Sequence, residues 1–179
     1  MPPSPPLNLD AQRAALRDVP DFPKPGIVFK DITPLLSDPR HFRALTAAFV
    51  EALAGEPIDK VAGIDARGFL FGAWLAEALG CGFVPVRKKG KLPWKSVSRA
   101  YELEYGTAEV ELHQDAVQEG ERVVLIDDLL ATGGTAAAAA ALIQELGGQL
   151  AALAFVIELG FLEGRQKLPP APVVSLLRY

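Results

Sequence analysis

The hydrophobic residues of this chain follow two different periodicities along its length. In residues 38–55, apolar side chains recur every three or four positions, at Phe42, Leu45, Phe49 and Leu53, which is the spacing of one buried face of a helix. An aspartate followed by a proline opens this segment and a glycine closes it, as is typical of helix ends. Other segments are short apolar runs bounded by turn-forming residues, which is typical of buried strands.

These patterns predict alternating strands and helices over the whole chain. Helices are expected at residues 9–17, 38–55, 68–80 and 133–146. Strands are expected at residues 60–65, 82–88, 108–113, 122–127, 151–159 and 172–179, with a short extended piece at 27–31. Because strands and helices alternate, we predict one α/β domain over residues 1–179, with a mainly parallel sheet flanked by helices.

Two of these strand predictions carry more detail. In residues 108–113, Ala108, Val110 and Leu112 alternate with polar residues, so this strand should have one buried and one solvated face. The run at 122–127 is almost continuously apolar, which predicts a central strand covered on both faces.

Composition and charge narrow the class of protein. Half of the 179 residues are hydrophobic and 22% are charged, which is typical of a globular chain. The formal net charge of −4 gives no reason to expect nucleic acid or a membrane surface as a partner. Polar residues interrupt the most apolar segment, 136–157, which makes it a poor membrane span.

The expected location is the cytoplasm. Cys81 is the only cysteine, so an internal disulfide is excluded and a reducing compartment fits. The first residues, MPPSPPLNLD, lack the basic and apolar regions of a signal peptide.

The stretch VVLIDDLLATGGT, residues 123–135, suggests the chemistry. Asp127 and Asp128 end a predicted central strand, and a turn with two glycines then leads into a helix. Ligands of such sheets bind beyond the carboxyl ends of the strands, and a helix N-terminus offers free N–H groups and partial positive charge to a phosphate. Thr132 and Thr135 add hydroxyl donors. Carboxylates suited to a diol beside a phosphate loop predict binding of a ribose 5-phosphate, and the same carboxylates could hold the water shell of Mg²⁺.

Each half of this stretch also has an ordinary structural interpretation. Apolar runs often end in acidic residues, and a glycine pair before a helix is often only a turn. An acid at a strand end also occurs in P-loop nucleoside triphosphatases, but neither G-x-x-x-x-G-K-[ST] nor the dinucleotide motif G-x-G-x-x-G occurs here.

Taken whole, the stretch resembles the phosphoribosyl pyrophosphate (PRPP) signature of the type I phosphoribosyltransferases. Other stretches resemble the adenine-specific branch of that family: VPDFPKPGIVFKDITPLL (19–36), GIDARGFLFG (63–72), RKKGKLP (87–93), YELEYG (101–106) and LEGRQKL (162–168). The resemblance runs from about residue 17 to the C-terminus. It implies a Rossmann-like fold with a small N-terminal hood at about 17–36 and a flexible lid loop at about 88–106.

The resemblance also implies a reaction, in which adenine and PRPP give AMP and pyrophosphate with Mg²⁺ through an oxocarbenium-like transition state. It implies a homodimer, with Arg87 a candidate to reach across the interface. Mg²⁺ would be held mainly by substrate and water, near Asp127 and Asp128, which face the ribose hydroxyls. The 5-phosphate would be held by Ala131, Thr132, Gly133, Gly134 and Thr135.

Roles for the remaining candidate residues follow from the same resemblance. The pyrophosphate would be bound by Asp65, Ala66, Arg67, Gly68, Arg87, Lys88 and Lys91. The adenine would be bound by Val28, Phe29, Lys30 and Leu159, with the ring of Phe29 stacked on the purine. Many relatives have arginine in place of Lys30, so a backbone contact to the base is expected there. Glu104 matches the family's acid near the base and is the candidate for proton transfer.

Two other functions remain open at this point. One is a regulator that responds to PRPP or purines through the same fold, although such regulators carry an added pair of DNA-binding helices. The other is a phosphoribosyltransferase for another base, such as xanthine or hypoxanthine.

Overall fold

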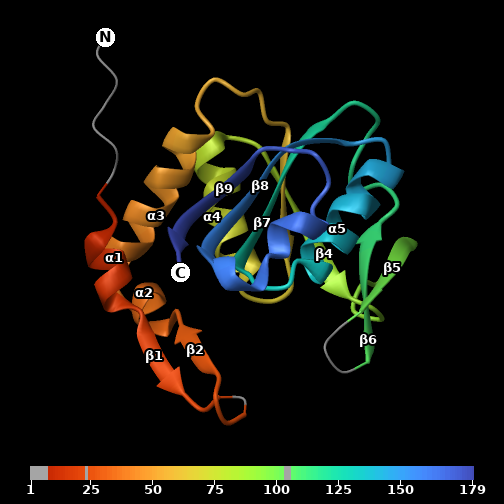
Figure 1. Ribbon diagram of the computed structural model, residues 1–179. Helices are drawn as coiled ribbons and strands as arrows, with labels where there is room; N and C mark the ends of the chain where they lie inside the picture. Colours follow the sequence, from red (N-terminus) through yellow and green to blue (C-terminus); the bar gives the residue numbers. More distant parts are fainter. Residues whose placement is uncertain (1–7, 23, 103–105) are drawn as a thin grey trace. The chain divides into compact units, whose positions relative to one another are not determined.

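The computed structural model describes residues 8–22, 24–102 and 106–179, and the chain divides into two compact units, residues 1–48 and 49–179 (Figure 1). The first unit begins with helix α1 (Asp10–Ala15), followed by strands β1 (Arg17–Pro20) and β2 (Val28–Asp31). The two strands pair antiparallel, with Val19 opposite Phe29. Helix α2 (Thr33–Ser37) follows, and helix α3 (Pro39–Ala52) begins in this unit and ends in the second.

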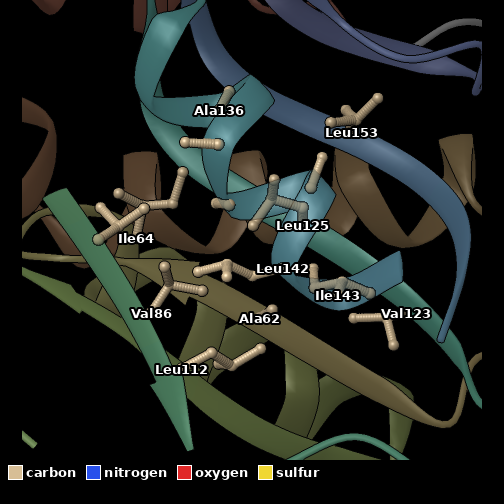
Figure 2. Close-up of a cluster of buried hydrophobic side chains, with 14 of the residues drawn as sticks. Ala62, Ile64, Val86, Leu112, Val123, Leu125, Ala136, Leu142, Ile143 and Leu153 are labelled. Atoms are coloured by element: carbon tan, nitrogen blue, oxygen red, sulfur yellow. The ribbon is translucent and has the colours of Figure 1, made fainter. Parts of the chain in front are cut away.

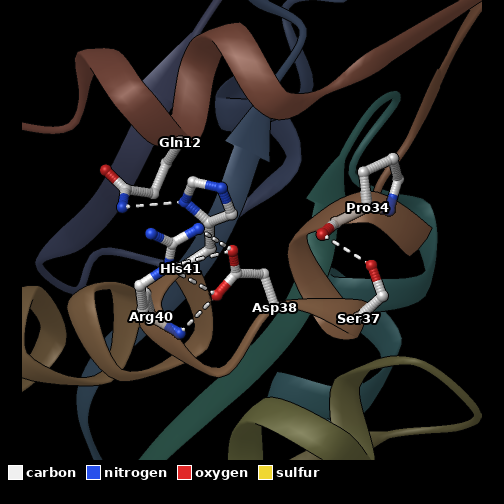
Figure 3. Close-up of polar contacts among 6 residues, drawn as sticks. All are labelled: Gln12, Pro34, Ser37, Asp38, Arg40 and His41. Carbon is white, nitrogen blue, oxygen red and sulfur yellow. Dashed lines mark hydrogen bonds and ion pairs between the residues drawn. The ribbon is translucent and has the colours of Figure 1, made fainter.

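The start of α3 is fixed by the aspartate that the sequence pattern marks as its cap (Figure 3). The carboxylate of Asp38 accepts a hydrogen bond from the backbone N–H of Arg40 at 2.8 Å and forms an ion pair with the Arg40 side chain at 2.7 Å. These contacts lower the pKa of Asp38 to about 2. In the same unit, the side-chain amide nitrogen of buried Gln12 lies 3.2 Å from Nδ1 of His41. The predicted stripe of apolar residues along the helix is buried.

The second unit is built on a seven-stranded sheet with the order β5-β6-β4-β3-β7-β8-β9 (Figure 1). Its strands are β3 (Lys60–Ile64), β4 (Gly82–Lys88), β5 (Ser96–Glu102), β6 (Thr107–His113), β7 (Arg122–Leu130), β8 (Gln149–Glu158) and β9 (Val173–Arg178). The five strands β4-β3-β7-β8-β9, in that spatial order, each pair in parallel with their neighbours. Strand β6 pairs antiparallel with both β4 and β5. The predicted α/β fold with a mainly parallel sheet is confirmed.

Helices α4 (Gly68–Leu79) and α5 (Gly134–Glu145) cover opposite faces of this sheet. Ala62 and Ile64 of β3 share a hydrophobic cluster with α5 (Figure 2). Gly63 lies between these two residues, and a Cβ added to it would lie 2.8 Å from the ring of Phe83. A Cβ added to Gly72 of α4 would lie 2.7 Å from the same ring, so Gly63 and α4 lie on the same face of the sheet. Since successive residues of a strand point to opposite faces, α4 lies on the face away from α5. Two short 3₁₀ helices, η1 (Gly160–Leu162) and η2 (Gly164–Lys167), connect β8 to β9.

Strands β7 and β5 both differ from the sequence prediction. Strand β7 continues through both aspartates to Leu130, so Asp127 and Asp128 lie inside the central strand and the turn before α5 is only three residues long. Strand β5 was not predicted at all. Its residues pair with β6 from Ser96↔His113 to Glu102↔Thr107, so the segment 88–106, expected to act as a lid, contains a paired strand. Val97 and Tyr101 of β5 pack against the hydrophobic core, which gives this polar strand its apolar side.

The prediction of a solvated polar face on β6 is wrong at Glu111. This side chain is only 5% exposed, although Val110 and Leu112 beside it face the core as predicted. The turn between β4 and β5 folds over Glu111 and donates hydrogen bonds to it. In the described part of the chain, no helix is both long and apolar enough to cross a membrane.

Candidate active site

A short loop between β7 and α5 forms a pocket at the carboxyl end of the central strand. The pocket is lined by Asp127, by residues 129–133 and by the first residues of α5, Gly134, Thr135 and Ala136. Gly133 has a φ of +81°, a left-handed conformation that favours glycine. A Cβ at this position would also collide with the backbone carbonyl of Gly164 in η2. The predicted phosphate loop is therefore a tight turn, packed from outside by η2, that presents the N-terminus of α5.

The two aspartates of β7 lie in different environments. Asp128 is 5% exposed and accepts a hydrogen bond at 2.5 Å from Nε of Arg67, which follows the neighbouring strand β3. Asp127 lines the pocket, and its Oδ1 accepts a hydrogen bond from the backbone N–H of Asp128 at 2.8 Å. Desolvation, and next the neighbouring Asp128 carboxylate, raise the pKa of Asp127 well above its ordinary value. The ionised form of Asp127 is therefore disfavoured in this site.

The turn from β3 into α4 contains the residues predicted to bind pyrophosphate. The peptide bond between Asp65 and Ala66 is cis. The Asp65 N–H donates to the carbonyl of Val86 in β4 at 2.9 Å. Gly68, the first residue of α4, touches β7, because a Cβ there would lie 3.0 Å from Oδ1 of Asp127. This glycine lets the turn of residues 65–68 and the aspartate pair approach each other closely.

Near the end of β4, Arg87 connects the basic segment that follows the strand to the same turn. Nε of Arg87 lies 3.4 Å from Oδ2 of Asp65, and the Arg87 guanidinium donates to the carbonyl of Lys91 at 3.0 Å. Lys88 is the last residue of β4 and is exposed. The structure thus brings together two of the predicted pyrophosphate ligands, Arg87 and Lys91, with Asp65.

The residues predicted to contact adenine occur in different parts of the chain. Val28, Phe29 and Lys30 form most of β2 in the first unit. There the ring of Phe29 meets the ring of Phe22 edge to face, with centroids 5.3 Å apart. The Lys30 ammonium donates to Asp18 at 2.6 Å.

The last two candidate residues are Leu159 and Glu104. Leu159 directly follows β8 in the second unit, and its N–H donates to the carbonyl of Leu130 at 2.9 Å, which holds it beside the end of β7. Glu104 lies outside the described residues.

Two residues that complete this region were missed from the sequence. Glu111 was expected on a solvated face, and only the fold of the preceding turn reveals its burial. Gly164 lies in the LEGRQKL stretch that carried part of the resemblance, but its packing against Ala131 and Gly133 depends on a contact distant in sequence.

A mainly parallel sheet whose central strand carries an acidic pair near its carboxyl end, followed by a glycine turn and a helix N-terminus, is the arrangement of a phosphoribosyl-transferring fold. The protein-family model for the phosphoribosyl transferase domain matches residues 34–173 of this sequence. The adenine phosphoribosyltransferase of Anaeromyxobacter dehalogenans is 57% identical over 171 residues, covering 96% of this chain and 99% of that protein. The chain belongs to the phosphoribosyl transferase family and, within it, to the adenine phosphoribosyltransferases.

Solved structures agree with this assignment. The crystal structure of adenine phosphoribosyltransferase from Thermoanaerobacter pseudethanolicus is 52% identical, with a TM-score of 0.93, and the match covers 96% of this chain and 100% of that one. The Saccharomyces cerevisiae enzyme, complexed with D-2,5-dideoxy-2,5-imino-altritol 1,6-bisphosphate and adenine, is 46% identical, with a TM-score of 0.89 and coverage of 93% and 97%.

Proposed function

We propose that this chain transfers the 5-phosphoribosyl group of PRPP to adenine, releasing pyrophosphate and forming AMP for purine salvage. The observation that carries the proposal is the acidic pair of β7 next to the tight turn into α5, with Arg67 bonded to Asp128 and Arg87 paired with Asp65 in the neighbouring turn. One ligand that fits all three parts is a ribose with a phosphate at one end and a pyrophosphate at the other.

The 5-phosphate is assigned to Ala131, Thr132, Gly133, Gly134 and Thr135. Free N–H groups at the start of α5 and the two threonine hydroxyls donate to its oxygens. The pocket lined by these residues supports this assignment. Since the phosphate stays bound to the ribose throughout the reaction, this loop anchors the group that is transferred.

The ribose hydroxyls are assigned to Asp127 and Asp128. Carboxylates accept hydrogen bonds from a vicinal diol and place negative charge near the ring as C1 becomes cationic. Because burial and Asp128 disfavour a second charge, the pKa of Asp127 is raised in the unliganded site. A cationic transition state would reverse that preference and favour the ionised pair.

The pyrophosphate is assigned to the turn of residues 65–68 and to Arg87, Lys88 and Lys91. Arginine presents a planar fork that matches two phosphate oxygens at once, and the lysines add point charges. These groups hold the leaving pyrophosphate as its bond to C1 breaks. Closure of the site over the substrates would exclude water, which would otherwise capture the oxocarbenium-like centre.

Magnesium fits this site as a partner of the substrate. Among the described residues, no group of three or more histidine, cysteine or acidic side chains could hold a metal ion. The acidic pair is well suited to bind the water shell of an ion that the pyrophosphate carries. When bound, Mg²⁺ would neutralise charge on the leaving pyrophosphate.

Adenine recognition is assigned to Val28, Phe29, Lys30 and Leu159. Strand β2 is an edge of a two-stranded ribbon, so half of its backbone groups point away from β1 and can pair with the base. The ion pair of Lys30 with Asp18 occupies its ammonium and supports a backbone contact at this position. Glu104 is proposed to accept the proton that the purine loses as N9 attacks C1.

The enzyme is proposed to be a cytoplasmic homodimer, in keeping with its family and its single cysteine. Incubation with PRPP, Mg²⁺ and adenine tests the function, and equal amounts of AMP and pyrophosphate are expected. A regulator would instead bind the same ligands without turnover and would shift duplex DNA on a gel, and that result would overturn the proposal.

A further inference from the structure

Glu111 is a buried acid that the assigned chemistry does not use. Its Oε1 accepts hydrogen bonds from the backbone N–H groups of Lys91 at 2.9 Å and Leu92 at 2.8 Å, and its Oε2 lies 3.2 Å from the hydroxyl of Ser96. Gly90, with a φ of +80°, supplies the left-handed residue of this turn. Successive N–H groups in such a turn converge into a concave anion-binding nest. The anion that fills it here is the chain's own carboxylate.

The peptide held by Glu111 is also held from its other side. Arg87 stands opposite Glu111 in the pairing of β4 with β6, so the two side chains lie on the same face of the sheet. The Arg87 guanidinium donates to the carbonyl of Lys91, while Glu111 accepts from the N–H of the same residue. Both the backbone N–H and the backbone carbonyl of Lys91 are therefore held by hydrogen bonds.

These contacts continue into the pyrophosphate turn. Arg87 also lies against Asp65 at 3.4 Å, so a connected path runs from Asp65 through Arg87 and Lys91 to Glu111. Desolvation disfavours the ionised form of Glu111, but hydrogen bonds from Leu92, Lys91, Gly90 and Ser96 outweigh it, and the pKa lies below its ordinary value. The carboxylate is therefore charged when the enzyme works, and its hydrogen bonds are charge-assisted.

We propose that Glu111 is a positioning residue for the pyrophosphate end of PRPP: it holds the turn of residues 89–92 so that Arg87 and Lys91 face the leaving group. The inference rests on the proposed function, because it concerns the assigned pyrophosphate site. Glu111 touches no substrate itself. It acts by removing the freedom of a basic turn that would otherwise be ordered only when the ligand binds.

The test compares Glu111→Ala and Glu111→Gln with a matched control, Glu109→Gln. Glu109 lies two residues earlier on the same strand and face, but its carboxylate pairs with the side chains of Lys89 and Ser98 and not with the backbone of the turn. The carbonyl of Glu109, which accepts from the N–H of Lys89, is unchanged by the substitution. Glu111→Ala should raise both KM for PRPP and Kd for Mg-pyrophosphate about 10-fold or more, because charge-assisted bonds are lost from the turn. Glu111→Gln keeps one acceptor oxygen and should give an intermediate change, while KM for adenine stays within about 2-fold in every variant.

A purely structural role would lower Tm without separating the two substrates. Hydrogen exchange provides a second measurement, in which the amides of Lys91 and Leu92 should exchange faster in Glu111→Gln and not in Glu109→Gln. If Glu111→Ala does not fold, the glutamine variant carries the test alone.

Three results would overturn the inference: unchanged affinity for PRPP, an equal loss for PRPP and adenine, or tighter pyrophosphate binding. The last would mean that Glu111 competes with the ligand for the nest. A wild-type protein that forms no AMP would instead overturn the proposed function, so the two failures are distinguishable.

Discussion

Nε of Arg67 lies 2.5 Å from Oδ2 of Asp128, and this contact joins the turn assigned to pyrophosphate with the acids assigned to ribose. Arg67 follows strand β3, and Asp128 lies near the carboxyl end of the neighbouring strand β7; the carboxyl ends of these two parallel strands meet at one edge of the sheet. The Asp128 side chain is 7% exposed, whereas the Arg67 side chain is 48% exposed. The guanidinium is therefore able to bind both a buried acid and a ligand in solvent.

Arg67→Lys should weaken pyrophosphate binding about 10- to 100-fold, the equivalent of one or two charge-assisted hydrogen bonds, because lysine keeps the charge but lacks the planar fork. AMP has no pyrophosphate, so its affinity should change little. Calorimetric titration of each ligand checks the difference. Parallel losses for AMP and Mg-pyrophosphate would show that Arg67 supports the site as a whole.

Asp127→Asn should stabilise the protein at neutral pH while impairing it as an enzyme. The pKa of Asp127 is raised in the folded state, so between the unfolded pKa and the folded pKa the native protein binds the extra proton and stability falls as pH rises. An asparagine has no such proton to lose. Thermal unfolding between pH 4 and 8 should give a flatter curve for the variant and a higher Tm at pH 7, with kcat/KM for PRPP at least about 10-fold lower. A variant less stable than wild type at pH 7 would contradict the assigned pKa shift.

Gly133→Ala should abolish AMP binding, and Gly120→Ala provides its control. Both glycines have nearly the same positive φ, +81° and +82°, so each alanine costs about 1 kcal/mol of stability from backbone strain. Only the Cβ at 133 would collide with Gly164, whereas a Cβ at 120 has no atom within 4 Å among the described residues. Equal AMP affinity in the two folded variants would remove the turn from the phosphate site.

Glu104→Gln distinguishes proton transfer from anchoring. If Glu104 accepts the purine proton, kcat should fall by roughly 10²- to 10⁴-fold with little change in PRPP affinity. If the acid only holds neighbouring cations, PRPP affinity should weaken and saturating PRPP should restore most of the rate. Steady-state kinetics over a range of PRPP concentrations separate the two roles, and a near-normal kcat at saturation would rule out proton transfer.

The features that could be predicted from the sequence are those that depend on residues close together in the chain. The cap at Asp38, the buried stripe from Phe42 to Leu53 and the apolar run at 122–127 each depend on neighbours in the chain, and the structure confirms all three. Strand β5 was not predicted because lysines, arginines and serines surround its two core-facing side chains, Val97 and Tyr101. Its pairing with β6 overrides that weak local signal.

The same distinction between local and long-range contacts applies to the candidate site. The acidic pair and the turn after it are contiguous in sequence, so their joint chemistry could be predicted. The burial of Glu111 and the packing of Gly164 depend on segments folding over them, and no periodicity within their own strand or turn records that.

The central claim is that this chain makes AMP from adenine, and a panel of bases tests it most directly. Initial rates are measured with PRPP, Mg²⁺ and each of adenine, guanine, hypoxanthine, xanthine and uracil, with nucleotide and pyrophosphate both quantified. The highest kcat/KM is predicted for adenine, with AMP and pyrophosphate formed in equal amounts. A higher kcat/KM for guanine or hypoxanthine would contradict the assignment to adenine.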